Sequence, residues 1–236
     1  MAEPSPDRIG PEYYDESDYF GSAPRHLRNP DSPFQKYRIR KVQEIYRPGK
    51  EDRVLDLGCG WGTFTFAFAP VVREVVGVDF SEKSIELCRR RAREEGVRNV
   101  DFHRVDAADT GLDRESFDVI VAADFLEHLD RDQTGAVLDE CARLLKRGGR
   151  LVVWTPHGGH FLELLRNRTS LLPADPTHVD YKTMERLRRL LLDRGFSIEK
   201  AYYAESHVPV LQDVERSFMS FVPLLRRRIA MLARKR

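Results

Sequence analysis

Short apolar segments alternate with amphipathic helical patterns along most of this chain. Five segments have the length and composition of buried β-strands, at residues 54–58, 75–79, 100–106, 117–124 and 150–156. The helical patterns between them are clearest at 81–96 and 132–149. Gly96, Gly148 and Gly149 stand where these two helices are expected to end. Because alternating strands and helices form parallel sheets covered on both faces, the pattern predicts one doubly wound α/β domain.

The segments that flank this alternation are less regular. Residues 1–33 are rich in Pro, Asp, Ser and aromatic residues, which predicts an irregular arm; its Tyr and Phe cluster at 13–20 is expected to pack on the sheet or to close over a pocket. The domain then comprises 34–236, with a second irregular lid segment at about 157–180. Further elements are expected as helices at 34–46, 181–195 and within 211–226, and as strands at 196–205 and 228–235.

Composition excludes several classes of protein. The 236 residues carry a formal net charge of +1, which argues against a dedicated nucleic-acid partner. No apolar run approaches the roughly 18–20 residues that span a bilayer, and the first ten residues do not resemble a signal peptide. The three cysteines, Cys59, Cys88 and Cys141, lack metal-ligand spacing and indicate reduced thiols in the cytoplasm. The basic tail from Pro223 allows peripheral membrane contact, although a terminal strand fits the fold better.

The segment VLDLGCGWGTF joins a strand to a helix through a glycine-rich turn. Gly58, Gly60 and Gly62 permit tight turning and close approach of a ligand. The dinucleotide fingerprint requires its third glycine one residue later, where Thr63 stands, so an NAD-dependent oxidoreductase is disfavoured. Asp56 precedes the turn and Asp79 ends the next strand. Two acids suit a cationic group and ribose hydroxyls, which indicates an adenosine that carries an amino acid and no phosphate.

This pattern, with VVGVDFS after it, resembles motifs I and II of the class I S-adenosylmethionine-dependent methyltransferases, and the resemblance covers about residues 50–156. It implies a seven-stranded, mostly parallel sheet whose last strand is antiparallel. It also implies a set of cofactor-binding residues. The methionine and ribose part would lie on Asp56, Gly58, Gly60 and Gly62, the ribose hydroxyls on Asp79, and the adenine on Phe80, Asp106 and Ala107.

A second motif, Asp124-Phe-Leu-Glu127-His128, follows the fourth strand. If a helix begins there, its three polar side chains share one face. The motif resembles the metal-binding motif of two O-methyltransferase groups, which act on polyprenylated catechols of ubiquinone biosynthesis and on the 3′-terminal ribose of small RNAs. Both groups add a later histidine, for which His178 stands in a similar setting, although both commonly have Glu where this chain has Asp124. The resemblance implies a divalent cation (Mg²⁺, Mn²⁺ or Zn²⁺) on Asp124, Glu127, His128 and His178.

Metal-free interpretations of the same residues stay open. Glu127 and His128 also suit orientation of the cofactor or capping of a helix, and His128 or His178 suits a general base. His157 and His160 are candidates for substrate contact or for ordinary loop positions. Arg38 or Arg40 is a candidate to bind the cofactor carboxylate.

The expected activity is methyl transfer from S-adenosylmethionine to a small-molecule acceptor, at a hydroxyl oxygen of a vicinal diol or catechol-like compound. Two alternatives remain: a metal-independent N- or C-methyltransferase of a small metabolite, and a non-catalytic protein that binds S-adenosylmethionine.

Overall fold

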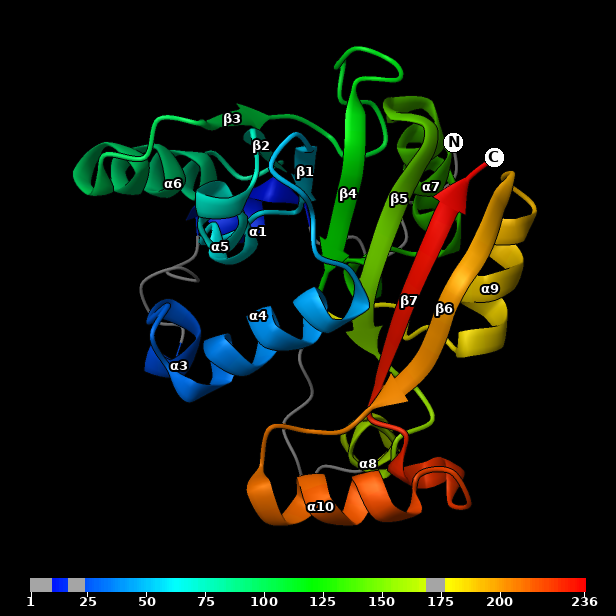
Figure 1. The fold of residues 1–236 in the computed structure, drawn as a ribbon. Helices are drawn as coiled ribbons and strands as arrows, with labels where there is room; N and C mark the ends of the chain where they lie inside the picture. Colours follow the sequence, from blue (N-terminus) through cyan, green and yellow to red (C-terminus); the bar gives the residue numbers. More distant parts are fainter. Residues whose placement is uncertain (1–9, 17–23, 169–176) are drawn as a thin grey trace, which may run out of the picture.

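The computed structural model describes residues 10–16, 24–168 and 177–236 and consists of a seven-stranded sheet with helices on both faces (Figure 1). The strands are β1 (Arg53–Leu57), β2 (Glu74–Asp79), β3 (Val100–Arg104), β4 (Phe117–Ala123), β5 (Leu145–Pro156), β6 (Phe196–Ala204) and β7 (Arg228–Lys235). Their order in the sheet is β3-β2-β1-β4-β5-β7-β6. β7 runs antiparallel to both of its neighbours, β5 and β6, and the other strand pairs are parallel. The predicted fold class is therefore confirmed.

Helices and short 3₁₀ turns connect these strands. The helices are α1 (Pro11–Glu16), α3 (Arg25–Arg28), α4 (Pro33–Ile45), α5 (Thr63–Phe68), α6 (Glu82–Glu95), α7 (Arg131–Leu144), α8 (Phe161–Arg168), α9 (Met184–Leu192) and α10 (Pro209–Phe218). The 3₁₀ turns are η1 (Ala69–Val71), η2 (Leu126–His128) and η3 (Pro223–Leu225). In the described part of the chain, no helix is both long and apolar enough to cross a bilayer.

Each face of the sheet has its own core. On β4, Ile120 and Ala122 pack with apolar side chains of α7 and α9, whereas Val119 and Val121 pack with those of α4 and α5. This alternation follows from the two-residue period of a strand. Because both faces are covered, β4 is an almost continuous apolar run, and its only polar side chain, Asp118, lies near its start. The buried core fixes the strand ends around which the site is built.

Two glycine predictions had different outcomes. Gly96 ends α6 in a left-handed conformation with φ 67°, as expected. The helix predicted at 132–149 instead ends at Leu144, and Gly148 and Gly149 lie inside β5. Gly148 has φ 77°, and the pairing of β5 with β4 shifts register nearby. The helix prediction was wrong at this end because the apolar pattern continues through Leu144 and Leu145, both fully buried.

The two segments predicted to be irregular contain short helices. Within 1–33, α1 and α3 are helical, and within 157–180, α8 is helical. Helical periodicity could not be recognised in α1 and α3 because these helices are too short, with six and four residues. Tyr19 and Phe20 of the predicted aromatic cluster lie outside the described residues. The tail forms β7 with Ile229 and Met231 fully buried, which confirms the terminal strand.

Candidate cofactor and metal site

A cavity lies at the carboxyl ends of β1, β2 and β4, where doubly wound sheets bind ligands. Its walls come from the glycine turn after β1, the end of β2, the 105–107 segment after β3, and the segment that follows β4. Two side chains from the N-terminal region, Tyr14 of α1 and Arg38 of α4, also line it. Predicted cofactor residues that line it are Gly58, Gly60, Asp79, Phe80, Asp106 and Ala107.

The glycine turn is held against the end of β2. The backbone N–H of Gly60 donates to Asp79 Oδ2 at 2.9 Å, and the N–H of Ser81 donates to Asp79 Oδ1 at 3.0 Å. Gly62 precedes α5 with φ 72°, and a Cβ there would lie 2.6 Å from the Phe66 ring, so glycine is required. Burial raises the pKa of Asp79 above its ordinary value, although these two N–H donors oppose the shift.

Asp56 lies beneath the turn, although the resemblance predicted that it would line the cofactor. Its carboxylate is 2% exposed and accepts hydrogen bonds from the backbone N–H and Oγ1 of Thr65, at 2.8 and 2.6 Å. Burial raises the pKa of Asp56 to about 6. Asp56 and Gly62 therefore support the start of α5, and neither of them lines the cavity.

Asp124 is held by two arginines. The Arg38 guanidinium lies 2.7 Å from Asp124 Oδ2, and Arg228 of β7 binds Oδ1. Burial alone would raise the pKa of Asp124, but Arg228 and Arg38 hold it below its ordinary value. One carboxylate faces two guanidiniums here, which leaves an excess of positive charge beside the cavity. Arg38 was a predicted candidate for this region, whereas Arg228, in the basic tail, was missed.

The predicted helix through Asp124, Glu127 and His128 does not form. Asp124 has φ 52°, a left-handed conformation that ends β4 sharply, and only the short turn η2 follows. Its carboxylate therefore points to the arginines rather than sharing a face with Glu127. The prediction of a common helical face was wrong because Asp, although it is one of the non-glycine residues found most often in this backbone conformation, adopts it only rarely.

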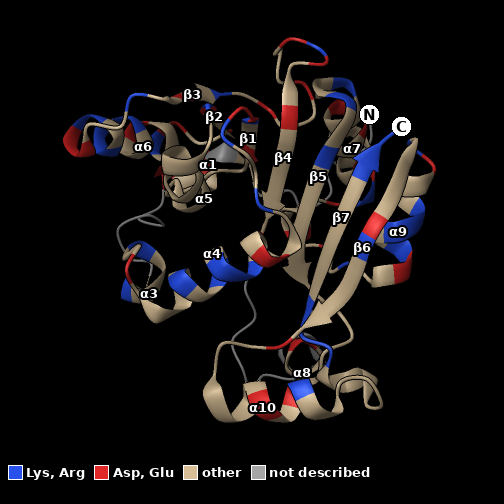
Figure 2. Cartoon of the chain, in the orientation of Figure 1, with Lys and Arg blue, Asp and Glu red and all other residues tan. Residues whose placement is uncertain are grey.

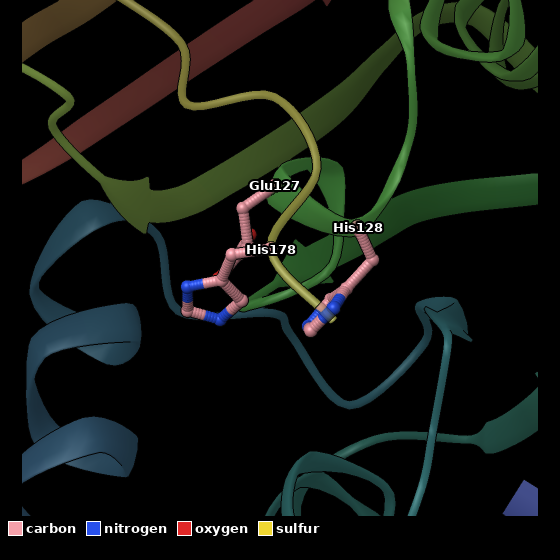
Figure 3. Close-up of side chains that lie close together, drawn as sticks. All are labelled: Glu127, His128 and His178. Carbon is pink, nitrogen blue, oxygen red and sulfur yellow. The ribbon is translucent and has the colours of Figure 1, made fainter. Parts of the chain in front are cut away.

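Glu127, His128 and His178 do come together. One candidate ligand atom from each lies within 4.8 Å of the other two, and Figure 3 shows the three side chains meeting between η2 and the segment of His178. The two imidazole centroids are 4.9 Å apart. Glu127 is 1% exposed, and its Oε2 accepts a hydrogen bond from Thr155 Oγ1 at 2.9 Å. His128 also lines the cavity, so the cluster borders it.

Backbone hydrogen bonds bring the distant His178 to this position. The N–H groups of Val179 and Asp180 both donate to the carbonyl oxygen of Glu127, at 3.0 and 3.1 Å. Lys182, fully buried, donates from Nζ to the carbonyl oxygen of Leu129 at 2.8 Å. The segment at 177–182 is thus fastened along η2, a relation that no local sequence pattern could reveal.

The donor set of this cluster suits a divalent cation. The Nδ1 atoms of His128 and His178 contact the Thr177 carbonyl oxygen and the Tyr181 hydroxyl, each at 2.9 Å. Such outer contacts leave the Nε2 lone pair of an imidazole available as a ligand. One carboxylate and two imidazoles suit Mn²⁺, Fe²⁺ or Zn²⁺ better than Ca²⁺. Three of the four predicted ligands therefore fit a metal, and Asp124 does not join them.

The other candidate histidines and Arg40 lie in different settings. His160 is fully buried and its Nε2 lies 3.1 Å from Glu215 of α10. His157 contacts the Arg226 carbonyl oxygen through Nδ1 at 3.1 Å, and burial lowers its pKa. Arg40 is exposed and lies 3.8 Å from Glu44. The histidine contacts are those of ordinary packed loop residues.

Comparison with known proteins shows which proteins this chain is similar to. Residues 54–149 match the family model described as "Methyltransferase domain". A Mycobacterium tuberculosis protein named "Probable S-adenosylmethionine-dependent methyltransferase" is 33% identical over 190 residues, 79% of this chain and 65% of that protein. The ubiquinone biosynthesis O-methyltransferase of Bordetella avium is 30% identical over 166 residues, 67% of this chain and 64% of that protein.

The fold also matches solved structures. The PH0226 protein of Pyrococcus horikoshii superposes with a TM-score of 0.70 at 21% identity, covering 93% of this chain and 99% of that one. At this identity the likeness concerns the fold alone. The chain covers less than two thirds of the length of the two curated relatives above.

Proposed function

Because this chain belongs to the class I S-adenosylmethionine-dependent methyltransferases, we propose that it transfers the methyl group of S-adenosylmethionine to a hydroxyl oxygen of a small molecule. The observation that carries the proposal is the cluster of Glu127, His128 and His178 at the border of the cofactor cavity. Carboxylate and imidazole groups of this kind suit activation of a hydroxyl group.

The cavity residues fit the parts of S-adenosylmethionine. The Asp79 carboxylate suits the two ribose hydroxyls, and Phe80, Asp106 and Ala107 suit the adenine. Arg38 suits the carboxylate of the methionine part. It shares its counter-ion Asp124 with Arg228, so one negative charge is set against two positive charges and Arg38 can bind a second carboxylate. The residues thus divide the cavity into an adenine end and a methionine end.

A divalent cation would bind Glu127, His128 and His178. When bound, it supplies Lewis-acid stabilisation of a deprotonated acceptor oxygen. Thr155 orients Glu127, the Thr177 carbonyl orients His128, and η2 places the cluster beside the methionine end of the cavity. Glu127 is buried, whereas His128 and His178 are half-buried at the border of the cavity, where an acceptor could approach them.

Two observations favour a small hydroxylated acceptor. A relative that matches 67% of this chain is named as an O-methyltransferase. Basic and acidic residues are interspersed on α6 (Figure 2) and the chain has a formal net charge of +1, which does not suit the backbone of a nucleic acid. A vicinal diol or catechol-like ring is the proposed acceptor class, because two adjacent oxygens can bind one cation.

A metal-free reaction is the second candidate. The contacts of Glu127 with Thr155 and of His178 with Tyr181 already give both groups hydrogen-bond partners. In that case His178, held by Tyr181, would act as the general base for an oxygen or nitrogen acceptor.

Calorimetric titration of chelator-treated protein with S-adenosylhomocysteine, then Mn²⁺, Mg²⁺ and Zn²⁺, tests the proposal. A panel of catechols and matched monohydroxy arenes, incubated with S-adenosylmethionine, would be read by product mass. Cofactor binding, a metal isotherm and methylation of catechols alone are expected. Methylation that survives chelation would support the metal-free candidate. Absence of cofactor binding would overturn the methyltransferase proposal.

A further inference from the structure

The short helix α1 lies at the adenine end of the cavity. Its Tyr14 lines the cavity together with Phe80, and their rings are 5.3 Å apart at an angle of 58°. Phe80 is 36% exposed, so it presents much of its surface to the cavity and solvent. Two aromatic side chains from segments more than 60 residues apart therefore form one wall at the end that suits adenine.

Asp15 fastens α1 to this position. One oxygen of its carboxylate accepts hydrogen bonds from Ser81 Oγ at 2.6 Å and from the N–H of Lys83 at 3.2 Å, and the other accepts from the N–H of Glu82 at 3.2 Å. These donors are at the N-terminus of the 14-residue helix α6, where a negative charge is stabilised. A carboxylate from another segment thus completes the helix end.

The anchoring serine also contacts the predicted ribose-binding residue. The N–H of Ser81 donates to Asp79 Oδ1 at 3.0 Å, while its hydroxyl binds Asp15. Ser81 is also the N-cap of α6, because its Oγ accepts from the N–H of Ser84 at 3.1 Å. The position of α1 is therefore linked through one residue to the ribose and adenine end of the site.

We propose that Tyr14 is a cofactor-binding residue that packs on the adenine of S-adenosylmethionine, and that Asp15 is its positioning residue. The inference rests on the proposed function for the identity of the ligand. It adds α1, from the region before the first strand, to a binding site whose sequence motifs all begin at β1. Tyr14 forms the wall beside Phe80, and Asp15 acts on the ligand only through the placement of Tyr14.

Binding measurements with two ligands test the role of Tyr14. S-adenosylhomocysteine and methylthioadenosine share the adenosine, but the second lacks the amino acid. Tyr14→Ala should weaken both by about tenfold, since an aromatic–base contact has an effect of this order, and Tyr14→Phe should retain most of the affinity. Phe221→Ala, at an 84% exposed aromatic side chain that does not line the cavity, is the control and should bind both ligands nearly as wild type does.

A double-mutant cycle tests the role of Asp15. Asp15→Ala should weaken S-adenosylhomocysteine severalfold and speed its dissociation, whereas Glu16→Ala, at the adjacent exposed carboxylate, should not. In the Tyr14→Ala background, Asp15→Ala should have almost no further effect on affinity.

The outcomes separate the two proposals. If wild type binds neither ligand, the proposed function fails. If wild type binds both and Tyr14→Ala binds them equally well, only the role of Tyr14 is overturned. Fully additive losses in the cycle would show that Asp15 acts independently of Tyr14 and would overturn its positioning role.

Discussion

The Nδ1 atom of His128 lies 2.9 Å from the backbone carbonyl oxygen of Thr177. A carbonyl oxygen can only accept, so Nδ1 carries the proton and the lone pair of the neutral imidazole is on Nε2. The segment after β5 thereby fixes the tautomer of His128, which follows β4. This contact, together with the bonds from 179–180 to Glu127, makes the metal hypothesis testable one residue at a time.

Metal affinity should depend on the cluster and not on Asp124. His178→Ala removes a ligand, and Glu127→Gln replaces an anionic carboxylate ligand with a neutral amide. Each should weaken Mn²⁺ binding by at least about a hundredfold, more than the loss of a typical outer contact. Asp124→Asn should leave the Mn²⁺ isotherm nearly unchanged, because the arginines already engage that carboxylate. Calorimetry measures each affinity. His103→Ala, on β3, is the control, and loss of binding in Asp124→Asn protein whose circular dichroism spectrum matches that of folded wild type would contradict the geometry.

Asp124→Asn should instead destabilise the fold. Its removal leaves the Arg38 and Arg228 guanidiniums, 13% and 18% exposed, without their shared counter-ion. Breaking a buried pair in this way costs about 3–5 kcal/mol of unfolding free energy. Urea unfolding measures this loss. Asp213→Asn removes a 76% exposed carboxylate 4.0 Å from Arg216 and should change stability by less than about 1 kcal/mol.

The local parts of this architecture could be predicted from sequence. Strand ends near Leu57, Asp79 and Ala123 follow from apolar periodicity, and the glycine turn follows from residue types at fixed spacing. The failures involve tertiary structure: the left-handed Asp124, and the partner Arg228 that lies 104 positions away. His178 was predicted through resemblance, but its placement by hydrogen bonds to the Glu127 carbonyl oxygen depends on the folded chain.

Tyr181 should influence metal binding without being a ligand. Its hydroxyl lies 2.9 Å from His178 Nδ1, so Tyr181→Phe removes the contact that orients this imidazole. A loss of about 10–100-fold in Mn²⁺ affinity is expected, with little change in S-adenosylhomocysteine affinity. Gly158→Ala gives an independent test, since its Cβ would lie 2.7 Å from Tyr181 Cβ and would displace it. Equal losses for both ligands would indicate a general structural defect instead.

Arg38 should distinguish between cofactor fragments. Arg38→Gln should weaken S-adenosylhomocysteine by about 10–100-fold, because a charge-assisted hydrogen bond to its carboxylate is lost. Methylthioadenosine has no carboxylate, so its affinity should fall much less. The ratio of the two dissociation constants is the readout, and it is insensitive to a uniform loss of folded protein. Arg40→Gln, at an exposed site on the same helix, should leave the ratio unchanged.

The unfolding free energy of Asp56→Asn should increase relative to that of wild type as the pH rises. Burial raises the pKa of this carboxyl from 3.8 to about 6, so the native state retains a proton that the unfolded chain releases. The unfolding free energy of wild type therefore falls between about pH 4 and pH 6, by about 3 kcal/mol at most from this group. The amide oxygen of Asn can accept both hydrogen bonds from Thr65, and it does not ionise.

Urea unfolding of both proteins at pH 4, 5, 6 and 7 gives the difference in unfolding free energy, from which groups common to both proteins cancel. That difference should move in favour of Asp56→Asn as the pH increases and should level off near pH 7, above the pKa of the folded state. A difference that stays constant over this range would mean that Asp56 titrates alike in the folded and unfolded chains. Its place beneath the glycine turn would then impose no electrostatic penalty, contrary to the burial observed.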